Sequence, residues 1–317
     1  MIYRGKAAID YLGLQIDSPD PGESSHWIKF NSKFSFAGGV FSGLQGFGCN
    51  GPSWQNPLHL LFQRPFRKMA SSFSSFKKID EIAFRVTKSQ GRAYDLDVLR
   101  QAITVAYLQE KIPEALGPSS MGCVIGDGFA SATSILLKSG SAKCVVLINL
   151  TKTLMVDLWF FQQWMGDVDF ESNVRLVTND ESLKKVLVEL ALEPSKLAVI
   201  AIQAKHHDLV KYCPVDFAIN IASMGEMNPS TISEYFEDLR SIAERKNIFF
   251  YCANRIRKEL PDGTVTSFEE YPWNNDDLIR DDELCPWTQF YYSFAPPFYR
   301  LYDGPFQHKL VRLSKGL

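Results

Sequence analysis

Two glycines flanking an aspartate follow an apolar run near the middle of the chain. Residues 121–132 read MGCVIGDGFASA, and 122–125 have the composition of a buried parallel strand. Gly126, Asp127 and Gly128 then form a tight turn that needs positive φ or a close backbone approach, and a helix opens near Ala130. A strand, a glycine-rich turn and a helix N-terminus together predict a nucleotide-type ligand site, although an ordinary strand-to-helix turn has the same pattern.

The next apolar run also ends in a polar residue. Residues 144–150 read CVVLINL, and Asn149 stands about 20 residues beyond the glycines, where a nucleoside site carries a group for the ribose hydroxyls. This group is an amide here rather than the usual carboxylate. We therefore expect Asn149 to meet the ribose through its side-chain amide.

Apolar runs and amphipathic segments alternate from residue 121 onward, which predicts an α/β fold with a Rossmann-like, doubly wound, mostly parallel sheet. Helices are expected over 130–139, 151–165, 180–192 and 229–245, and further strands over 174–178, 197–203, 215–222 and 248–252. Right-handed crossovers bring the polar residues that follow the strands to one edge of the sheet. These residues are Gly126, Asp127, Gly128, Asn149, Gln203, Ser223, Glu226 and Asn254.

The composition is that of a globular protein with a large core. The 317 residues are 45% hydrophobic and 22% charged, and 34 basic against 36 acidic side chains leave a net charge of −2. This balance gives no broad attraction to nucleic acid. No run approaches the roughly 18 apolar residues that span a membrane, and no signal-peptide core is present, so we expect a cytoplasmic protein. The six cysteines form no CxxC pair, so neither a disulfide framework nor a zinc knuckle is predicted.

The first 90 residues show no regular alternation and are expected to form an irregular arm or lid, with the α/β domain spanning 91–317. Residues 30–52 mix aromatic side chains with Gly, Ser and Asn, which suits either a lid over the sheet or a structural wrap. His26 and His59 are interpreted as ordinary polar residues, because no second ligand stands at metal spacing. A helix within 93–116 introduces the domain.

After Asn254 the chain becomes rich in aromatic residues and proline. Residues 259–268 have the pattern of a hairpin, and 308–313 (HKLVRL) that of an antiparallel final strand. Aromatic rings between Asn and Asp residues are typical of a carbohydrate site, because rings stack on sugar C–H faces. The same composition also suits an aromatic cover over the core.

Six segments resemble a known family. They read IGDGFAS (125–131), INLTKTLMVDL (148–158), INIASMGEMNP (219–229), LPDGTVTSFEEYPW (260–273), DELCPW (282–287) and YDGPFQHKLV (302–311). Over about residues 115–315 the chain resembles the sugar O-methyltransferases of bacterial glycan and polysaccharide loci. The resemblance implies a class I S-adenosylmethionine (SAM) fold, with a seven-stranded sheet whose last strand is antiparallel, and a sugar or glycan substrate. Val124 and Asn149 stand where many SAM enzymes have acids.

Methyl transfer to a hydroxyl is an in-line displacement, in which the protein chiefly positions the reactants and excludes water. We expect Asn149 at the ribose, Gln203 at the adenine edge, and Asn220 or Ser223 at the methyl-transfer pocket. The complete set of expected cofactor-binding residues is Gly126, Asp127, Gly128, Asn149, Thr151, Gln203, Asn220 and Ser223.

A sugar hydroxyl is a poor nucleophile at neutral pH, so a general base near the acceptor is expected. Glu226 is the first choice, because it follows a central strand at the sheet edge, although it equally suits a charge at a helix N-terminus. His308, His206 and His207 are second choices, and the His206-His207 doublet also suits a plain surface role. The acidic runs at 276–277 and 281–283 are interpreted as solvated charge, so no metal site is predicted, although some sugar O-methyltransferases use a divalent cation.

Two other functions fit the same glycine turn. A nicotinamide-dependent sugar oxidoreductase would use it for NAD(P), but Ser131 stands where a third glycine or alanine is usual, and no Tyr-x-x-x-Lys pair follows a central strand. A non-catalytic glycan-binding protein on the same fold is the other alternative. The sequence leaves the acceptor sugar open and is compatible with a homo-oligomer.

Overall fold

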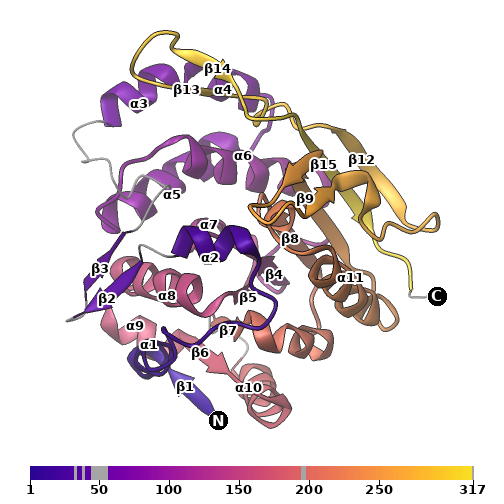
Figure 1. Ribbon diagram of the computed structural model, residues 1–317. Coiled ribbons are helices and arrows are strands. Elements are labelled where there is room, and N and C mark those ends of the chain that lie inside the picture. Colours follow the sequence, from indigo (N-terminus) through magenta and orange to yellow (C-terminus); the bar gives the residue numbers. More distant parts are fainter. Residues whose placement is uncertain (32–33, 38–39, 44–55, 194–197, 316–317) are drawn as a thin grey trace.

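One large sheet runs through the computed structural model, which describes residues 1–31, 34–37, 40–43, 56–193 and 198–315 (Figure 1). Its nine strands are β1 (Ile2–Arg4), β4 (Met121–Ile125), β5 (Cys144–Asn149), β6 (Val174–Val177), β7 (Ala198–Gln203), β8 (Phe217–Ile221), β9 (Phe249–Arg255), β12 (Leu278–Leu284) and β15 (Phe306–Arg312). They lie in the order β1-β6-β7-β5-β4-β8-β9-β15-β12.

The remaining described elements are helices and three small hairpins. The α-helices are α1 (Gly5–Gly13), α2 (Ser25–Asn31), α3 (Asn56–Phe62), α4 (Arg64–Ala70), α5 (Phe76–Ser89), α6 (Leu96–Lys111), α7 (Ser131–Ser139), α8 (Thr151–Met165), α9 (Asp167–Asn173), α10 (Asp180–Leu192) and α11 (Pro229–Ala243). The 3₁₀ helices are η2 (Ala204–Tyr212), η3 (Met224–Glu226) and η4 (Phe268–Glu270). The hairpins are β2 (Ser35–Ala37) with β3 (Val40–Ser42), β10 (Arg257–Glu259) with β11 (Val265–Ser267), and β13 (Phe290–Tyr292) with β14 (Tyr299–Leu301).

Helices cover both faces of the sheet, because its central strands are apolar on both sides. Every residue of β5 and of β7 is buried. Successive side chains of a strand point to opposite faces. Val145 and Leu147 of β5 therefore join one apolar cluster with α5, α6, α7 and α8, whereas Val146 and Ile148 join the other with α10 and α11.

The strand order confirms the predicted fold class. Strands β4, β5, β7, β8 and β9 pair in parallel, and β15 runs antiparallel between β9 and β12. A mostly parallel, doubly wound sheet with an antiparallel last strand is the class I methyltransferase type implied by the resemblance. The sheet has nine strands rather than seven, because β1 pairs with β6 at one edge and β7 lies between β5 and β6.

Several predicted boundaries are confirmed to the residue, and local chemistry explains why. Helices α8 and α10 span 151–165 and 180–192 as expected. The side chain of Asn179 accepts a hydrogen bond from the Ser182 backbone, and the Ser182 hydroxyl accepts one from the Asn179 backbone N–H, so α10 begins with a capping box. Asp95 caps α6 by accepting a hydrogen bond from the Val98 backbone at 3.1 Å.

The first 90 residues contain more regular structure than their composition suggests. Strand β1 joins the main sheet, α1 packs on α8 and α9, and α5 packs on α6 and α7. Phe76, Ile79, Ala83 and Val86 form the buried face of α5, at the spacing of one side of a helix. These residues share one apolar cluster with the sheet. The arm expected over 30–52 falls largely outside the described residues.

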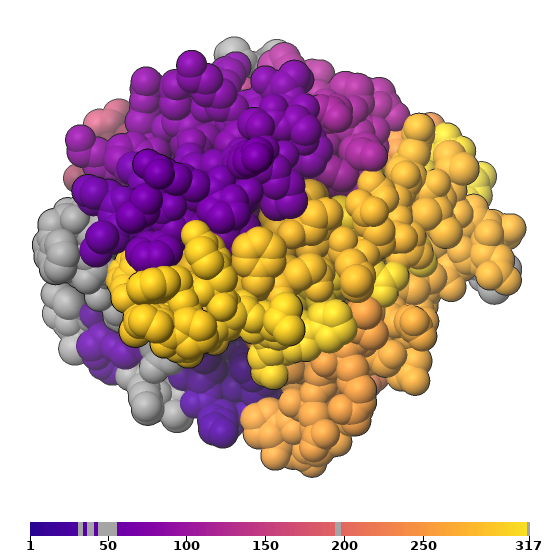
Figure 2. All heavy atoms as spheres, turned by 90° about the horizontal axis from the view of Figure 1, so that it is seen from above, coloured from indigo at the N-terminus to yellow at the C-terminus, as the bar shows by residue number. Residues whose placement is uncertain are grey.

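Aromatic side chains join the C-terminal hairpin to α3. The Phe62 ring stacks on Tyr292 with ring centroids 5.8 Å apart, and it also contacts Phe298 and Tyr299. Figure 2 shows this C-terminal segment, in yellow, lying against the earlier helices, in purple. These particular rings therefore pack on one another, in the manner of an aromatic cover. Within the described residues, none of the helices has the length and apolarity needed to cross a bilayer.

Candidate functional site

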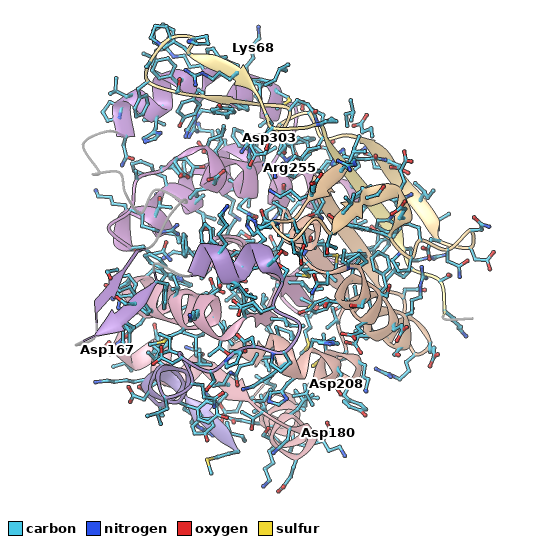
Figure 3. The ribbon with its side chains drawn as sticks, in the orientation of Figure 1. Lys68, Asp167, Asp180, Asp208, Arg255 and Asp303 are labelled. Carbon is cyan, nitrogen blue, oxygen red and sulfur yellow. The ribbon has the colours of Figure 1, made fainter. Side chains whose placement is uncertain are left out.

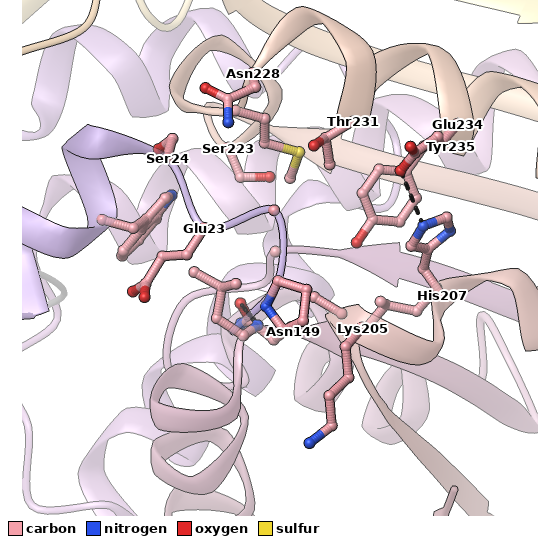
Figure 4. Close-up of a pocket in the computed structure, with 18 of the residues that line it drawn as sticks. Glu23, Ser24, Asn149, Lys205, His207, Ser223, Asn228, Thr231, Glu234 and Tyr235 are labelled. Carbon is pink, nitrogen blue, oxygen red and sulfur yellow. Dashed lines mark hydrogen bonds and ion pairs between the residues drawn. The ribbon is translucent and has the colours of Figure 1, made fainter. Parts of the chain in front are cut away.

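A cavity of about 340 Å³ opens at the edge where the parallel strands end (Figure 4). The ends of the strands supply Gly126 after β4, Asn149 and Leu150 after β5, Lys205 after β7, and Ser223 after β8. The N-terminal segment crosses the opposite side with Pro21, Gly22, Glu23, Ser24 and Trp27, and α11 contributes Thr231, Glu234 and Tyr235. This is the position in which open α/β sheets bind ligands.

The glycine turn has the predicted conformation. The groups around it, however, contact other parts of the protein. Gly126 and Gly128 have φ of 71° and 69°. A Cβ at Gly126 would clash with the side chain of Ser223, so the Cβ side of this glycine is filled by protein, while the glycine itself borders the cavity. Asp127 accepts hydrogen bonds from the backbones of Ala132 and Thr133 at 2.8 and 2.7 Å, so its carboxylate caps α7 and does not face the cavity.

The amide of Asn149 borders the cavity but is already engaged. Its Nδ2 donates to Asp157 at 2.9 Å, and its Oδ1 accepts from the Leu150 backbone at 3.0 Å. Asp157 is fully buried and also accepts from the Ala130 backbone at 2.8 Å. Burial, reinforced by the nearby charge of Asp127, raises the pKa of Asp157. The expected contact of Asn149 with ribose is therefore not supported by its hydrogen bonds.

Thr151 and Gln203 hold the N-terminal segment against the sheet. Both the backbone N–H and the hydroxyl of Thr151 donate to Asp20 at 2.7 Å. Gln203 donates to the Thr151 hydroxyl at 2.8 Å and to Gln15 at 3.1 Å. Gln203 is fully buried and is absent from the cavity wall, and its expected role at an adenine edge stays a prediction. These contacts place residues 15–24 across the carboxyl ends of the strands.

Asn220, Ser223 and Asn254 form a buried hydrogen-bonded network behind the cavity. Asn220 donates to the Ile125 carbonyl at 2.9 Å and to the Ser223 hydroxyl at 2.5 Å. Asn254 donates to Asn220 at 2.8 Å and accepts from the Gly225 backbone at 2.8 Å. Of the three, only Ser223 borders the cavity. The network fixes the turn after β8, which carries Glu226.

Glu226 lies beside the cavity and is paired with a histidine that the sequence did not single out. Its Oε2 is 3.4 Å from Nε2 of His26, and its backbone carbonyl accepts from the Ser24 hydroxyl at 2.5 Å. Burial raises the pKa of Glu226 to about 7, although the charges of Lys258 and Arg255 oppose the shift. Burial, together with the same two cations, lowers the pKa of His26 to about 4. Near pH 7 the His26 ring is therefore uncharged and the Glu226 carboxyl is only partly ionised. Glu226 can take up a proton near this pH.

Arg255 ends β9 next to this pair, and Figure 3 shows it near Asp303. The two side chains are 3.9 Å apart, with Asp303 almost fully exposed. The Arg255 guanidinium also lies over the Tyr302 ring, 5.1 Å from its centroid. A cation and an aromatic ring thus stand on the outer side of Glu226.

The other candidate bases are placed differently. His207 lines the cavity, with Nδ1 2.6 Å from Asp238 and Nε2 3.3 Å from Glu234. Burial opposes its charged form, but the hydrogen bond and charge of Asp238 outweigh it and raise the pKa of His207. His206 does not border the cavity. His308 is buried on β15, away from the cavity wall, so the geometry does not bring it together with Glu226.

Most residues of the cavity wall were missed by reasoning from sequence, including a carboxylate, an indole and a phenol. These groups belong to Glu23, Trp27 and Tyr235. Glu23 and Trp27 come from the first 90 residues, where no periodic pattern marks a site. Tyr235 has helical spacing and was read only as part of a packed helix.

No family model and no curated protein matches the sequence. Several solved structures have a similar fold. One is described as converting a disulfide bond into a thioacetal group during echinomycin biosynthesis. It has 12% identity over 68% of this chain and 82% of that one, with a TM-score of 0.40. Magnesium protoporphyrin IX methyltransferase from Synechocystis, solved with S-adenosylhomocysteine (SAH), has 14% identity over 67% and 81%, with a TM-score of 0.39. TrmK from M. capricolum, also solved with SAH, has 11% identity over 66% and 69%, with a TM-score of 0.31. These similarities are distant, and the fold class rests on the strand order itself.

Proposed function

We propose that this protein is a SAM-dependent O-methyltransferase that methylates a sugar hydroxyl of a glycan or a nucleotide sugar. The cavity at the ends of β4, β5, β7 and β8 carries the proposal, because it combines the expected position with a volume of about 340 Å³, within the range of small-molecule sites. The antiparallel β15 supports a methyltransferase over a nicotinamide enzyme, since the dinucleotide-binding sheet has six strands in parallel order.

The cavity wall fits a nucleoside carrying an amino-acid chain. Leu150 and Trp27 offer apolar surface for a base, and Glu23 and Lys205 offer opposite charges. We assign to the carboxylate of Glu23 the ribose-binding role first expected of Asn149, because both residues line the cavity (Figure 4). The N-terminal segment would then complete the cofactor site.

Bound SAM would supply an activated methyl group, whose carbon–sulfur bond breaks as a new carbon–oxygen bond forms and SAH leaves. The protein must hold the acceptor oxygen in line and remove its proton. Glu226 suits the second task, because a carboxylate with a pKa of about 7 accepts a proton near neutral pH. His26, 3.4 Å away, orients this carboxylate and is itself neutral at that pH.

The sugar acceptor is supported by the segments that carry the family resemblance. Two of them, 219–229 and 260–273, meet around Glu226, because β10 and β11 pack on η3. The Thr266 hydroxyl donates to the Gly225 carbonyl at 2.9 Å and fixes this contact. Resembling residues thus surround the proposed base rather than being scattered over the core.

Isothermal titration with SAM, SAH and NAD⁺, followed by a methyl-transfer assay, tests the proposal. We expect binding of SAM and SAH but not NAD⁺, and transfer of one methyl group to a sugar hydroxyl in a panel of nucleotide sugars, detected by mass spectrometry. Binding of NAD⁺ in place of SAM would reassign the protein to the oxidoreductases. SAM binding with no transfer to any sugar would overturn the acceptor class and leave the cofactor assignment intact.

A further inference from the structure

A histidine and two carboxylates gather on the far edge of the sheet, outside the cavity described above. Glu283 of β12 and His308 of β15 are directly opposite each other in the antiparallel ladder. Asp281 lies two residues before Glu283 and therefore projects from the same face. The register shifts by one residue between Ile279 and Asp281, so the irregularity lies just before the two carboxylates, which are themselves in regular register. One ligand atom from each of the three residues lies within 4.8 Å of the others.

His308 is held rigidly, and one of its ring nitrogens lacks a partner. The residue is 1% exposed, and its ring packs against Tyr107 and Trp287 at centroid distances of 5.4 and 5.2 Å. Nδ1 is 3.1 Å from the Tyr251 hydroxyl. Nε2 is buried without a hydrogen-bond partner and faces Oε1 of Glu283 at 3.6 Å. A buried ring nitrogen left unpaired has a cost that a bound cation would remove.

We propose that Asp281, Glu283 and His308 bind one divalent transition-metal ion of the zinc class. His308 would bind through Nε2, while Nδ1–H donates to Tyr251, the arrangement that fixes metal-binding histidines in proteins. Zinc–ligand bonds of about 2.0–2.2 Å place neighbouring ligands roughly 3.3 Å apart, close to the observed spacing of His308 and Glu283. The imidazole favours zinc over magnesium or calcium, which prefer oxygen ligands alone.

Lys111 is the group with which the ion would compete. Its Nζ lies 3.2 Å from Oδ2 of Asp281, an oxygen that also accepts from the Tyr107 hydroxyl at 2.9 Å. The Lys111 side chain is 41% exposed at the end of α6, so it can turn to solvent when an ion arrives. Tyr107 can keep its hydrogen bond and orient the carboxylate. Glu283, 58% exposed, leaves the site open to entry and to water ligands.

Such an ion would join β12 to β15 at the edge of the sheet, and it stands apart from the proposed methyltransferase site. Binding of the ion would replace the interpretation of 281–283 as solvated charge alone. Asp282, between the two carboxylates, behaves as that interpretation expects. Its side chain pairs with Lys309 at 2.8 Å and accepts from Gln307 at 2.5 Å.

The test uses the full chain freed of metal with a chelator and titrated with ZnCl₂, CoCl₂ and MgCl₂. We expect one equivalent of Zn²⁺ to bind and to raise Tm by a few degrees at saturation. Co²⁺ should bind in the same place and give a visible ligand-field spectrum. Mg²⁺ should not compete. Absence of Zn²⁺ binding, or equal binding of Mg²⁺, would overturn the proposal.

Four variants locate the ion. Glu283→Gln, whose side chain is exposed, should weaken Zn²⁺ binding at least tenfold, whereas the neighbouring control Asp282→Asn should leave it unchanged. His308→Asn should abolish it, and the ligand-field spectrum of bound Co²⁺ should disappear with it. Lys111→Gln should tighten binding, because it removes the competing cation. If His308→Asn fails to fold, Glu283→Gln and Lys111→Gln decide. Unchanged affinity in both of these would overturn the assignment.

Discussion

Oε2 of Glu226 lies 3.4 Å from Nε2 of His26, which joins the turn after a central strand to the start of the N-terminal helix α2. Burial moves both groups away from their ordinary values, with the pKa of Glu226 raised to about 7 and that of His26 lowered to about 4. A carboxyl and an imidazole that are both close to neutral do not form a stable ion pair. They form a proton-accepting site beside the cavity, and this follows only when the two distant segments meet.

Glu226→Gln should reduce kcat by about 10²–10⁴-fold, because the amide keeps the size of the side chain but cannot take the acceptor proton. The affinity for SAM should remain within about threefold of wild type, since the carboxylate is not in the cavity wall. Steady-state kinetics and SAM titration measure the two effects separately. Glu270→Gln, an exposed carboxylate on η4, is the matched control. An unchanged kcat in Glu226→Gln would rule out the base role.

The Glu226 carboxyl should also make the free energy of unfolding depend on pH. Its pKa in the folded protein, about 7, exceeds the unfolded value of 4.5, so the folded state binds its proton more tightly. The stabilisation is full below about pH 4.5 and is lost as pH rises to about 7. Glu226→Gln should therefore gain about 3 kcal/mol relative to wild type between pH 4.5 and pH 8, as measured by urea unfolding. If the free energies of unfolding of Glu226→Gln and wild type changed with pH in parallel, the carboxyl would not be desolvated in the folded protein.

The ribose-binding role of Glu23 is tested by affinity. Glu23→Gln should weaken SAM and SAH binding about 10-fold, because a charge-assisted hydrogen bond to a hydroxyl becomes a neutral one. Calorimetric titration measures the change, and Glu244→Gln, exposed beyond the end of α11, is the control. Equal affinities in Glu23→Gln and wild type would remove the N-terminal segment from the cofactor site.

Periodicity and local chemistry predicted where the elements lie, but they could not predict which side chains would be engaged within the protein. The end of β5 was placed correctly, and Asn149 does reach the edge of the sheet. Its partner Asp157 lies two turns into α8 and points back at it, a contact that no spacing rule specifies. Positions follow from the 3.6- and 2-residue periods, whereas hydrogen-bond partners depend on how the elements pack.

The positions of β6 and β7 within the sheet could not be predicted from the sequence for a similar reason. Both are short, fully buried strands, so the sequence does not say which of them lies next to β5. Asp20, Glu23 and His26 were missed because they come from a segment without periodic pattern, and their role arises only where that segment crosses the strand ends. A site built by a distant segment cannot be predicted from strand-end residues alone.

The contact between Asn149 and Asp157 explains the departure from the usual acid and gives a prediction. Asn149→Asp would place two carboxylates at the present 2.9 Å separation in a buried site. We expect a loss of about 2–4 kcal/mol in the free energy of unfolding at pH 8, and a smaller loss at pH 5, where one of the carboxyls can hold a proton. Chemical denaturation measures both. The double variant Asn149→Asp with Asp157→Asn again has one amide and one acid at this contact. It should recover much of the lost free energy of unfolding. No recovery would mean that this contact does not limit the choice of residue 149.

Ser223 occupies the Cβ side of Gly126, and substitution can test whether this contact is what requires glycine there. Gly126→Ala should lower the free energy of unfolding by about 2–4 kcal/mol, because the new Cβ meets the Ser223 side chain and φ is 71°. Gly140→Ala is the control, since φ there is 75° with no atom within 4 Å of the added Cβ, and it should cost only about 1 kcal/mol. Adding Ser223→Gly to Gly126→Ala removes the clashing side chain, and should return part of the stability as judged by Tm. If the double variant is no more stable than Gly126→Ala, the clash with Ser223 is not what fixes glycine at this position.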